Sequence, residues 1–304
     1  MQQSKLTILI PTWNRKKDVE ALLNVLLPQF LKRSDVDLIV SNNGSIDGTF
    51  EYLETLRGTP RSNIIHQPVN LGASIHCGWL YGHARGEYLW MIGDDDLIDL
   101  DTLDIVCQTL YENPNIGWMH IPGIINVVGM DEPLQTKCPS KTIRVEQARE
   151  LFTDYGHWPS WISSNVISTQ LIQQELPSVK LSTSFWPWQL LMRSVANHPA
   201  MILGSRKISA GENSTWLADR DCILIIQLPL MLFESDFLTS REKRGVFYQL
   251  YDLHPILFVR LLSRSPYMAA KILCLCPALL NWRTFLAFVT VVKVKFFHQK
   301  ISHN

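Results

Sequence analysis

Short runs of β-forming residues alternate with amphipathic helical patterns through the first 121 residues. The runs that read as strands are residues 6–10, 37–41, 63–66, 88–92 and 116–121. The helical patterns between them cover residues 18–27, 50–56, 74–84 and 100–110. Strands that alternate with helices at this spacing form crossover units on a parallel sheet. The sequence therefore predicts an α/β fold whose mostly parallel sheet is flanked by helices.

The second half of the chain is less regular. Residues 122–145 read as loops and short strands, and helical patterns follow near 146–153, 168–176 and 187–197. We predict a main domain over 1–235, made of a nucleotide-binding half (1–121) and an acceptor half (122–235). A helical C-terminal extension over 236–304 completes the predicted organisation.

Composition favours a packed core and a division of roles along the chain. Of 304 residues, 46 % are hydrophobic and 18 % are charged, which argues against disorder. The net charge is zero, but residues 241–304 carry ten Lys or Arg against two Asp or Glu. The remaining residues hold eighteen basic and twenty-six acidic side chains. A basic tail on an acidic body indicates two different tasks.

The cysteines and the first residues bear on the cellular compartment. None of the six cysteines forms a CxxC pair, and a chain of this size needs no disulfides for stability. We therefore expect reduced thiols and a cytoplasmic protein. A strand-like run begins at Leu6, so no signal peptide is expected.

Polar residues follow three of the predicted strands at the point where each strand ends. These clusters are Thr12–Trp13–Asn14, Asn42–Asn43 and Asp94–Asp95–Asp96. Ligands of open parallel sheets bind beyond the carboxyl ends of the strands, so we expect the three clusters to converge on one edge.

The three consecutive aspartates are the sharpest chemical feature. Adjacent carboxylates repel each other unless a cation or a helix N-terminus compensates their charge. Their oxygens suit Mg²⁺ or Mn²⁺, which also coordinate phosphate. Capping of the following helix is the alternative interpretation, and the residues alone leave both open.

Three segments in order resemble the family 2 glycosyltransferases of the GT-A fold. They read LTILIPTWNR from Leu6, LIVSNNGSIDGT from Leu38 and NLGASIHCGWLYGHARGEYLWMIGDDD from Asn70. The family typically shows Pro-Thr-aromatic-Asn after a strand, Asp-Asp-Gly-Ser-x-Asp-Gly-Thr, Asn-x-Gly, and Gly-Glu-Tyr before Asp-x-Asp. The match covers roughly residues 4–100. The GDDD form resembles the abequosyltransferase-like branch of bacterial surface-polysaccharide enzymes.

The resemblance implies a set of donor-binding residues. Trp13 would stack on the nucleobase, for which aromatic faces are suited, although a core role is the alternative. Asn42 and Asn43 stand where the family has an acidic residue, and an amide can read a different base edge. The implied donor-binding residues are Pro11, Thr12, Trp13, Asn42, Asn43, Asn70, Gly72 and Asp94.

The resemblance also implies a Mn²⁺ or Mg²⁺ site. Counting from Gly86–Glu87–Tyr88, the two motif aspartates fall at Gly93 and Asp95, so the first is missing. Asp94 beside it is the expected substitute for ribose or metal contact. Asp95 is the expected first metal ligand, and Asp96 the second.

The acceptor half departs from the family pattern. Inverting members carry a Glu-Asp pair before a helix ending in Arg, and alignment on Arg193 puts Trp186–Pro187 there. Neither residue can act as a base, so the weak candidates are Asp154, His157 and Glu212, and the stereochemical course stays open. An aromatic cluster forms either an acceptor pocket or a subdomain core: Trp158, Trp161, Phe185, Trp186 and Trp188.

The basic, apolar segment 260–300 allows two interpretations. It can lie in a membrane interface with its cations near anionic headgroups, or pack as a helical hairpin on the main domain. The longest run in it without a formal charge, Ile272–Trp282, is too short to span a bilayer. The acidic body and the lack of recognition motifs argue against nucleic-acid binding.

The sequence thus predicts a metal-dependent hexosyl- or deoxyhexosyltransferase that uses a nucleotide-sugar donor. The expected acceptor is a glycan or a lipid-linked molecule in bacterial lipopolysaccharide O-antigen or capsule biosynthesis. The protein would act peripherally on the inner face of the plasma membrane. One alternative is a catalytically inactive binding or assembly protein, which the missing base motivates. Another is a nucleotidyltransferase, which predicts a Gly-rich phosphate loop that Pro11–Lys17 does not supply.

Overall fold

The computed structural model divides the chain into two compact units. It describes residues 3–125, 134–155, 161–181, 186–210, 227–253, 255–281 and 283–284. The first unit comprises Met1–Ala148 and Trp158–Ser214, and the second comprises Arg149–His157 and Thr215–Asn304. The second unit therefore includes the tail expected over 236–304, a stretch before it and a short segment from the middle of the chain.

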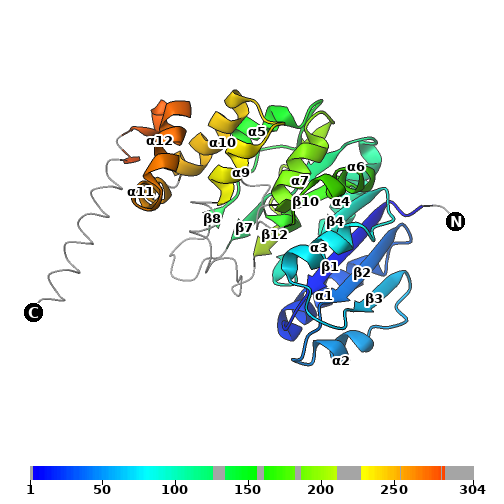
Figure 1. Ribbon diagram of the computed structural model, residues 1–304. Coiled ribbons are helices and arrows are strands. Elements are labelled where there is room, and N and C mark those ends of the chain that lie inside the picture. The colour runs from blue at the N-terminus through cyan, green and yellow to red at the C-terminus, as the bar shows by residue number, and fades with distance from the viewer. Residues whose placement is uncertain are drawn as a thin grey trace, which may run out of the picture. The chain divides into compact units, whose positions relative to one another are not determined.

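An eight-stranded sheet forms the centre of the first unit (Figure 1). Its strand order is β3-β2-β1-β4-β10-β6-β11-β9. Four adjacent strands are parallel: β1 (Leu6–Thr12), β2 (Val36–Asn42), β3 (Ser62–His66) and β4 (Tyr88–Met91). The predicted mostly parallel α/β sheet is confirmed.

The second half of the first unit adds antiparallel strands to this sheet. β10 (Asn165–Ser168) runs antiparallel between β4 and β6 (Trp118–His120). β11 (Ala200–Ile202) is parallel to β6, and β9 (Ile143–Val145) is the antiparallel edge. A smaller four-stranded sheet contains, in spatial order, β5 (Asp96–Ile98), β12 (Ile208–Ala210), β7 (Gly123–Ile125) and β8 (Leu134–Gln135).

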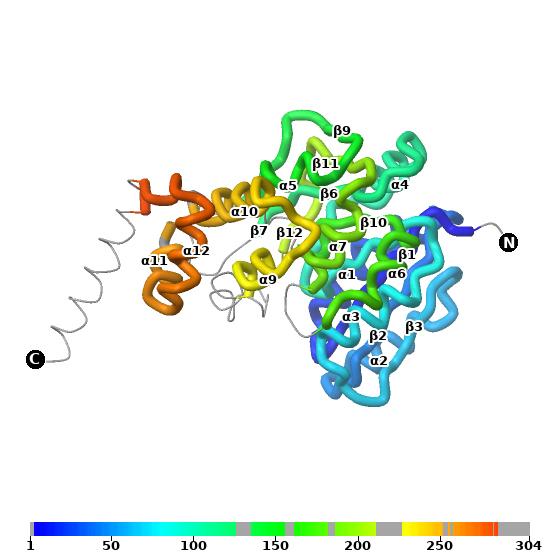
Figure 2. Tube along the Cα trace, turned by 45° about the horizontal axis from the view of Figure 1, so that its top comes forward, coloured from blue at the N-terminus to red at the C-terminus, as the bar shows by residue number. Residues whose placement is uncertain are grey.

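Helices cover both faces of the large sheet. On one side, Leu6, Ile8 and Ile10 of β1 share a buried core with α1 (Lys16–Phe30) and α4 (Thr102–Glu112). α1 buries Val19, Leu22, Leu23 and Leu26, the spacing of an amphipathic helix. Helices α3 (Ala73–Tyr81) and α6 (Thr169–Glu175) contact each other and lie over the opposite face (Figures 1 and 2). The shorter α2 (Thr49–Glu54) contacts β3, and α7 (Trp186–Val195) contacts α6. Two 3₁₀ turns complete the unit, η2 (Ile162–Ser164) and η3 (Leu176–Ser178).

The second unit is helical where the structure describes it. Its elements are α5 (Arg149–Tyr155), α9 (Leu228–Glu234), α10 (Ser240–Leu253), α11 (Pro255–Arg264), α12 (Pro266–Leu275) and the 3₁₀ turn η5 (Pro277–Leu279). Thr239 and Glu242 cap α10 reciprocally, because the Thr239 backbone N–H donates to Glu242 Oε2 (2.7 Å) and the Glu242 N–H donates to Thr239 Oγ1 (3.3 Å). The ring of Tyr251 on α10 meets Phe258 on α11 at 5.3 Å between centroids. Within the described residues, no helix is both long enough and apolar enough to cross a membrane.

Candidate functional site

The three polar clusters predicted from the sequence meet at the carboxyl edge of the parallel strands. The Asn43 backbone N–H donates to the Thr12 carbonyl at 2.9 Å, which joins the ends of β1 and β2. The Asn14 N–H donates to Ser45 Oγ at 2.8 Å, and the Arg15 side chain reaches Asp94 after β4. The expected convergence on one edge is therefore confirmed.

The amide side chains at this edge hold its loops together. Asn43 donates to Asn70 Oδ1 at 2.9 Å and accepts a bond from the Leu71 N–H at 3.0 Å. Asn70 Oδ1 also accepts from the Gly72 N–H at 2.7 Å. Asn42 Oδ1 accepts from the Ser45 N–H at 2.9 Å. Four of the predicted donor-binding residues, Asn42, Asn43, Asn70 and Gly72, thus lie together. The side-chain oxygens of the three asparagines hold the loops in position.

Trp13 is presented to solvent at the tip of the first loop. Its side chain is 48 % exposed, while Thr12 before it is buried and ends β1, which also contains Pro11. Asn14 adopts φ 52°, and its Oδ1 accepts a bond from the Ile46 N–H at 2.8 Å. Asn tolerates this left-handed conformation better than most residues. The loop therefore leaves the indole face open instead of placing it in the core, the alternative considered for it.

Arg15 bridges two of the three aspartates. Its Nη1 lies 2.8 Å from Asp94 Oδ1 and 2.9 Å from Asp95 Oδ2. Burial raises the pKa of Asp94 to about 6, although the charge of Arg15 opposes this shift. The pKa of Arg15 is itself raised, because the attraction of Asp94 and Asp95 outweighs the effect of its burial.

Asp96 has different neighbours from the other two aspartates. Trp161 Nε1 donates to Asp96 Oδ2 at 2.8 Å, and the Ser163 hydroxyl donates to the same oxygen. Ser163 Oγ in turn accepts from the Gly93 N–H at 2.8 Å. Burial, followed by the nearby charge of Asp95, raises the pKa of Asp96 to about 7. A Cβ atom on Gly93 would lie 3.0 Å from Asp96 Oδ2, so a larger residue there would press on this carboxylate.

The carboxylates that share Arg15 have the chemistry of a divalent-cation site. Asp94 and Asp95 already direct one oxygen each at a common positive group. Mg²⁺ and Mn²⁺ commonly take one or two protein carboxylates and complete their coordination with substrate phosphates and water. Across the described ranges, no group of three or more His, Cys, Asp or Glu side chains is arranged to hold a metal ion. Asp94 and Asp95 by themselves offer a cation only part of a coordination shell.

The residues proposed for the acceptor side lie in different places. Asp154 is exposed on α5 in the second unit, while His157 and Glu212 lie outside the described residues. In the aromatic cluster, Trp186 and Trp188 are buried on α7, as expected for a core. Trp161 donates a hydrogen bond to Asp96 at the carboxyl ends of the parallel strands, which we call the polar edge. Trp158 and Phe185 lie outside the described residues.

A buried histidine on α3, His76, contacts β2 next to the polar edge. It is buried on α3, and its Nε2 lies 2.7 Å from Ser41 Oγ on β2. Burial lowers the pKa of His76 to about 4, so the imidazole is neutral in the folded protein at neutral pH.

Acidification should therefore change how much His76 contributes to stability. Between pH 6.5 and 4 the unfolded chain binds a proton at this residue that the folded chain rejects. The wild type should lose about 2–3 kcal/mol relative to His76→Gln between pH 7.5 and 4.5. Urea unfolding of both proteins at these two pH values measures the difference. An equal difference at both pH values would contradict a neutral, buried imidazole.

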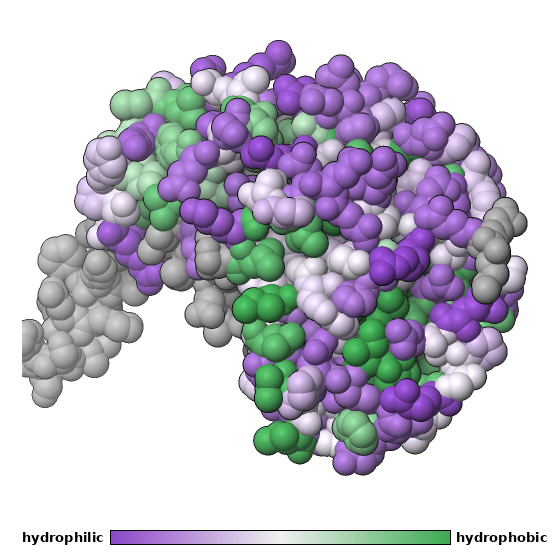
Figure 3. Space-filling view, turned by 45° about the vertical axis from the view of Figure 1, so that its right-hand side comes forward, coloured by the Kyte–Doolittle hydropathy of each residue, from purple (hydrophilic) through white to green (hydrophobic). Residues whose placement is uncertain are grey.

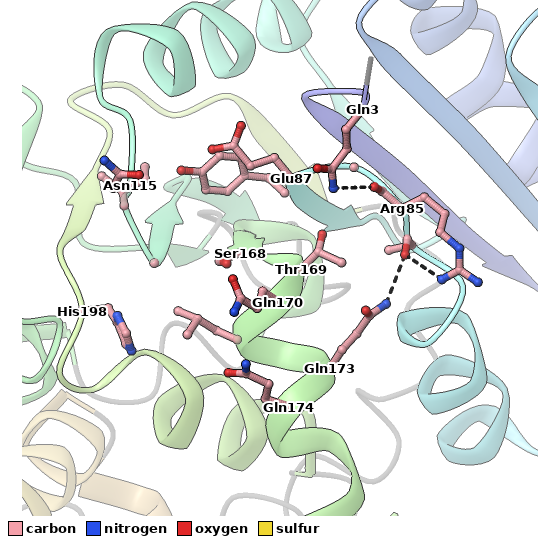
Figure 4. A pocket seen from close by; sticks show the side chains of 16 residues that line it. Gln3, Arg85, Glu87, Asn115, Ser168, Thr169, Gln170, Gln173, Gln174 and His198 are labelled. Atoms are coloured by element: carbon pink, nitrogen blue, oxygen red, sulfur yellow. Dashed lines mark hydrogen bonds between the residues drawn. The ribbon is translucent and has the colours of Figure 1, made fainter. Parts of the chain in front are cut away.

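Among the described residues of the first unit, two cavities lie at opposite ends of the strands. One of about 450 Å³ lies at the ends of β2 and β3 and is lined in part by Asn42, Gly44, Phe50 and His66. The other, of about 820 Å³, is lined by Gln3, Arg85, Glu87, Ser168 and several glutamines of α6 (Figure 4). It lies at the amino end of β4 and contains none of the residues predicted for the site.

Arg15, Trp161 and Ser163 contact the aspartates, and none of them was predicted for this role. Arg15 had a usable signal in the sequence for a contact with the aspartates. It directly follows the polar cluster at the end of a strand and is the first positively charged residue there. Ser163 had none, since 67 residues separate it from Asp96 and its neighbours read only as loop.

Large apolar side chains also stay exposed at this edge, among them Ile46, Val69 and Ile75. The face seen in Figure 3 is mostly hydrophilic with smaller apolar patches.

Solved structures of other proteins share this fold. The chain superposes on residues 1–349 of Staphylococcus aureus TarS in complex with UDP-GlcNAc with a TM-score of 0.65 and 15 % identity, covering 97 % of this chain and 92 % of that one. Mannosyltransferase PcManGT from Pyrobaculum calidifontis, in complex with GDP-Man and Mn²⁺, gives a TM-score of 0.59 and 15 % identity, with 97 % and 81 % covered. At these identities the likeness establishes the GT-A type of fold.

Sequence comparison identifies relatives over about a third of the chain. The abequosyltransferase RfbV of Salmonella typhimurium is 36 % identical over 99 residues, 32 % of this chain and 30 % of that protein. The dolichyl-phosphate beta-glucosyltransferase ALG5A of Trichomonas vaginalis is 29 % identical over 110 residues, 33 % of each chain. The aligned part thus spans about a third of these curated relatives.

A family model covers more of the chain than these pairwise alignments do. The model for glycosyl transferase family 2 matches residues 7–161, about half of the 304 residues. The matched segment contains the loops after β1, β2 and β3, the three aspartates and Trp161. The chain belongs to glycosyltransferase family 2, as its strand-end motifs predicted.

Proposed function

We propose that this protein transfers a sugar from a nucleotide-sugar donor to a glycan or lipid-linked acceptor. One observation carries the proposal. A family 2 chain presents an exposed indole, Trp13, on the same sheet edge as an arginine-bridged carboxylate pair, Asp94 and Asp95. An aromatic face suits a nucleobase, and the charged groups suit a diphosphate with its cation.

The donor's nucleoside would occupy the loops after β1, β2 and β3. Trp13 stacks on the base, and Pro11 and Thr12 line the pocket beside it. Asn42, Asn43, Asn70 and Gly72 shape the opposite wall, because their hydrogen bonds fix the loop geometry. The spare N–H groups of the amides can donate to acceptor atoms of the base, which an acidic residue cannot do.

The donor's diphosphate would lie near Asp94 and Asp95 with Mn²⁺ or Mg²⁺. A divalent cation held there supplies positive charge that stabilises the departing nucleoside diphosphate. For the second ligand, predicted as Asp96, the contacts favour Asp94, because Asp94 shares a cation with Asp95 while Asp96 accepts bonds from Trp161 and Ser163. Asp96 then fixes the turn that orients the two ligands. The PcManGT structure with GDP-Man and Mn²⁺ supports metal use in this fold.

The acceptor would belong to bacterial surface-polysaccharide assembly, such as lipopolysaccharide O-antigen or capsule. The abequosyltransferase relative supports this pathway, and a lipid-linked acceptor suits a basic tail over residues 260–300. In the described part of the tail, Arg264 and Lys271 are exposed and can meet anionic headgroups. The protein would then work peripherally on the cytoplasmic face of the plasma membrane. Asp154, His157 and Glu212 remain the candidates for the acceptor's base.

Nucleotide binding tests the proposal directly. Calorimetry with UDP, GDP, CDP and dTDP, each with and without Mn²⁺, should reveal metal-dependent binding of one nucleotide. Asp95→Ala should abolish that dependence, whereas Asp104→Ala, which removes an exposed carboxylate on α4, should preserve it. If the wild type binds none of the four nucleotides with or without the metal, the donor-site proposal is wrong.

A further inference from the structure

The guanidinium of Arg15 lies where the carboxylate pair would hold a metal ion. A single nitrogen, Nη1, is within 2.9 Å of both Asp94 Oδ1 and Asp95 Oδ2. Arg15 immediately precedes α1, and its side chain is only one-fifth exposed. The contact therefore places a fixed positive charge between the two acids, largely shielded from solvent.

This ion pair compensates a repulsion that the fold would otherwise retain. Asp94 and Asp95 are adjacent in the chain and largely buried, so two unpaired charges there would be unfavourable. Arginine stays protonated at any pH the protein meets. Arg15 is thus the cation that faces both carboxylates and aligns them.

The same contact conflicts with metal binding. Mg²⁺ sits about 2.0–2.1 Å from its oxygen ligands, so an ion on both oxygens would come against the guanidinium nitrogen. Two cations at that separation repel strongly in a partly buried site. The metal and Arg15 cannot share Asp94 and Asp95 in the arrangement observed.

A displaced Arg15 would gain a phosphate partner when the donor is present. The guanidinium fork matches the oxygens of a phosphate group, and Arg15 starts from the same sheet edge as the proposed donor pocket. We propose that Arg15 is a built-in counter-cation that competes with the divalent metal for Asp94 and Asp95 and moves to the donor's diphosphate when the metal binds. This inference rests on the proposed function and adds a role for Arg15, to which the sequence analysis assigned none.

The exchange couples metal binding to nucleotide binding. Metal without nucleotide must displace Arg15 but offers the guanidinium no phosphate in exchange. We therefore expect the metal alone to bind weakly. Metal with a nucleoside diphosphate gives Arg15 a new partner, so the two ligands bind more tightly together than separately. Such coupling is reciprocal, because each ligand strengthens the other by the same factor.

Removal of Arg15 should therefore affect the two kinds of binding in opposite directions. Mn²⁺ binding is measured by the electron paramagnetic resonance signal of the free ion, on the full chain, with and without UDP, GDP, CDP or dTDP. Arg15→Gln should bind Mn²⁺ alone about tenfold more tightly than the wild type, and the coupling between Mn²⁺ and the bound nucleotide should fall about tenfold. Arg15→Lys, which retains a charge, should stay close to the wild type in binding Mn²⁺ alone.

A matched variant separates this competition from a general change of charge. Lys17→Gln removes one positive charge from an exposed position two residues further along the chain. It should leave both Mn²⁺ affinity and coupling within twofold of the wild type. Thermal unfolding monitored by circular dichroism verifies that each variant is folded at the assay temperature.

The outcomes distinguish this inference from the proposed function. If Arg15→Gln binds Mn²⁺ alone no more tightly than the wild type, or the same as Lys17→Gln, Arg15 does not compete and the inference is wrong. That result leaves nucleotide binding by the wild type unaffected. If the wild type binds no nucleotide with any metal, the proposed function fails, whereas the comparison of Mn²⁺ alone still reports on Arg15.

Discussion

Asp95→Asn is expected to lower sugar transfer about a hundredfold or more, with little change in stability. The amide preserves the size of the side chain but loses the charge that binds a hard cation and faces Arg15. The loss falls on stabilisation of the leaving diphosphate, so kcat should fall more than the donor's KM rises. Transfer from the nucleotide sugar selected by the binding panel into a membrane fraction measures it.

Two further variants show whether the loss of activity is specific to Asp95. Asp104→Asn alters an exposed carboxylate of α4 and should retain activity within twofold. Asp96→Asn should retain far more activity than Asp95→Asn, because an amide oxygen can still accept the bonds from Trp161 and Ser163. Near-wild-type turnover by Asp95→Asn would remove Asp95 from the proposed site. Equal losses at positions 95 and 96 would instead favour Asp95 and Asp96 as the ligand pair.

Gly44→Ala should destabilise the protein by about 3 kcal/mol and weaken nucleotide binding. Gly44 has φ 74°, and an added Cβ atom would lie 2.7 Å from the Val69 carbonyl carbon and 2.8 Å from the Asn70 nitrogen. Both atoms belong to the backbone, so the loop that Asn43 and Asn70 fix would have to move. Urea unfolding measures the stability, and calorimetry with the preferred nucleotide measures binding.

Gly58 provides a matched control for this strain. Its φ is 94°, but a Cβ atom there would meet no atom within 4 Å. Gly58→Ala should therefore cost only about 1–2 kcal/mol, the cost of the left-handed backbone, and leave nucleotide binding unchanged. Equal effects of the two substitutions would mean that the close approach of the two loops at Gly44 is not important.

Local periodicity was sufficient to predict the parallel strands of the sheet and the edge that carries the site. The apolar run at Leu6–Ile10 became a buried strand, and the pattern from Asp18 became helix α1. Chain direction then determines where strand ends lie, because parallel neighbours end on the same side. For this reason Trp13, Asn43 and Asp94 could be placed together from the sequence. The predicted helices near 146–153, 168–176 and 187–197 also correspond to α5, α6 and α7.

The sequence did not reveal which partners each aspartate and each tryptophan would contact. It offered no side-chain partners for Asp94, Asp95 and Asp96, and it grouped Trp161, Trp186 and Trp188 in one aromatic cluster. In the structure, Asp95 contacts Arg15 while Asp96 contacts Trp161 and Ser163. Trp186 and Trp188 are buried, whereas Trp161 reaches the polar edge.

By itself, then, the sequence determined the α/β architecture, the family and the loops that form the site, because these follow from local periodicity and strand direction. Only the tertiary structure decided which aspartates share Arg15 and which one accepts bonds from Trp161 and Ser163. Those partners are separated by about 65 to 80 residues, and consecutive side chains after a strand point in different directions. Their pairing depends on how distant segments pack against one another, which no local pattern records.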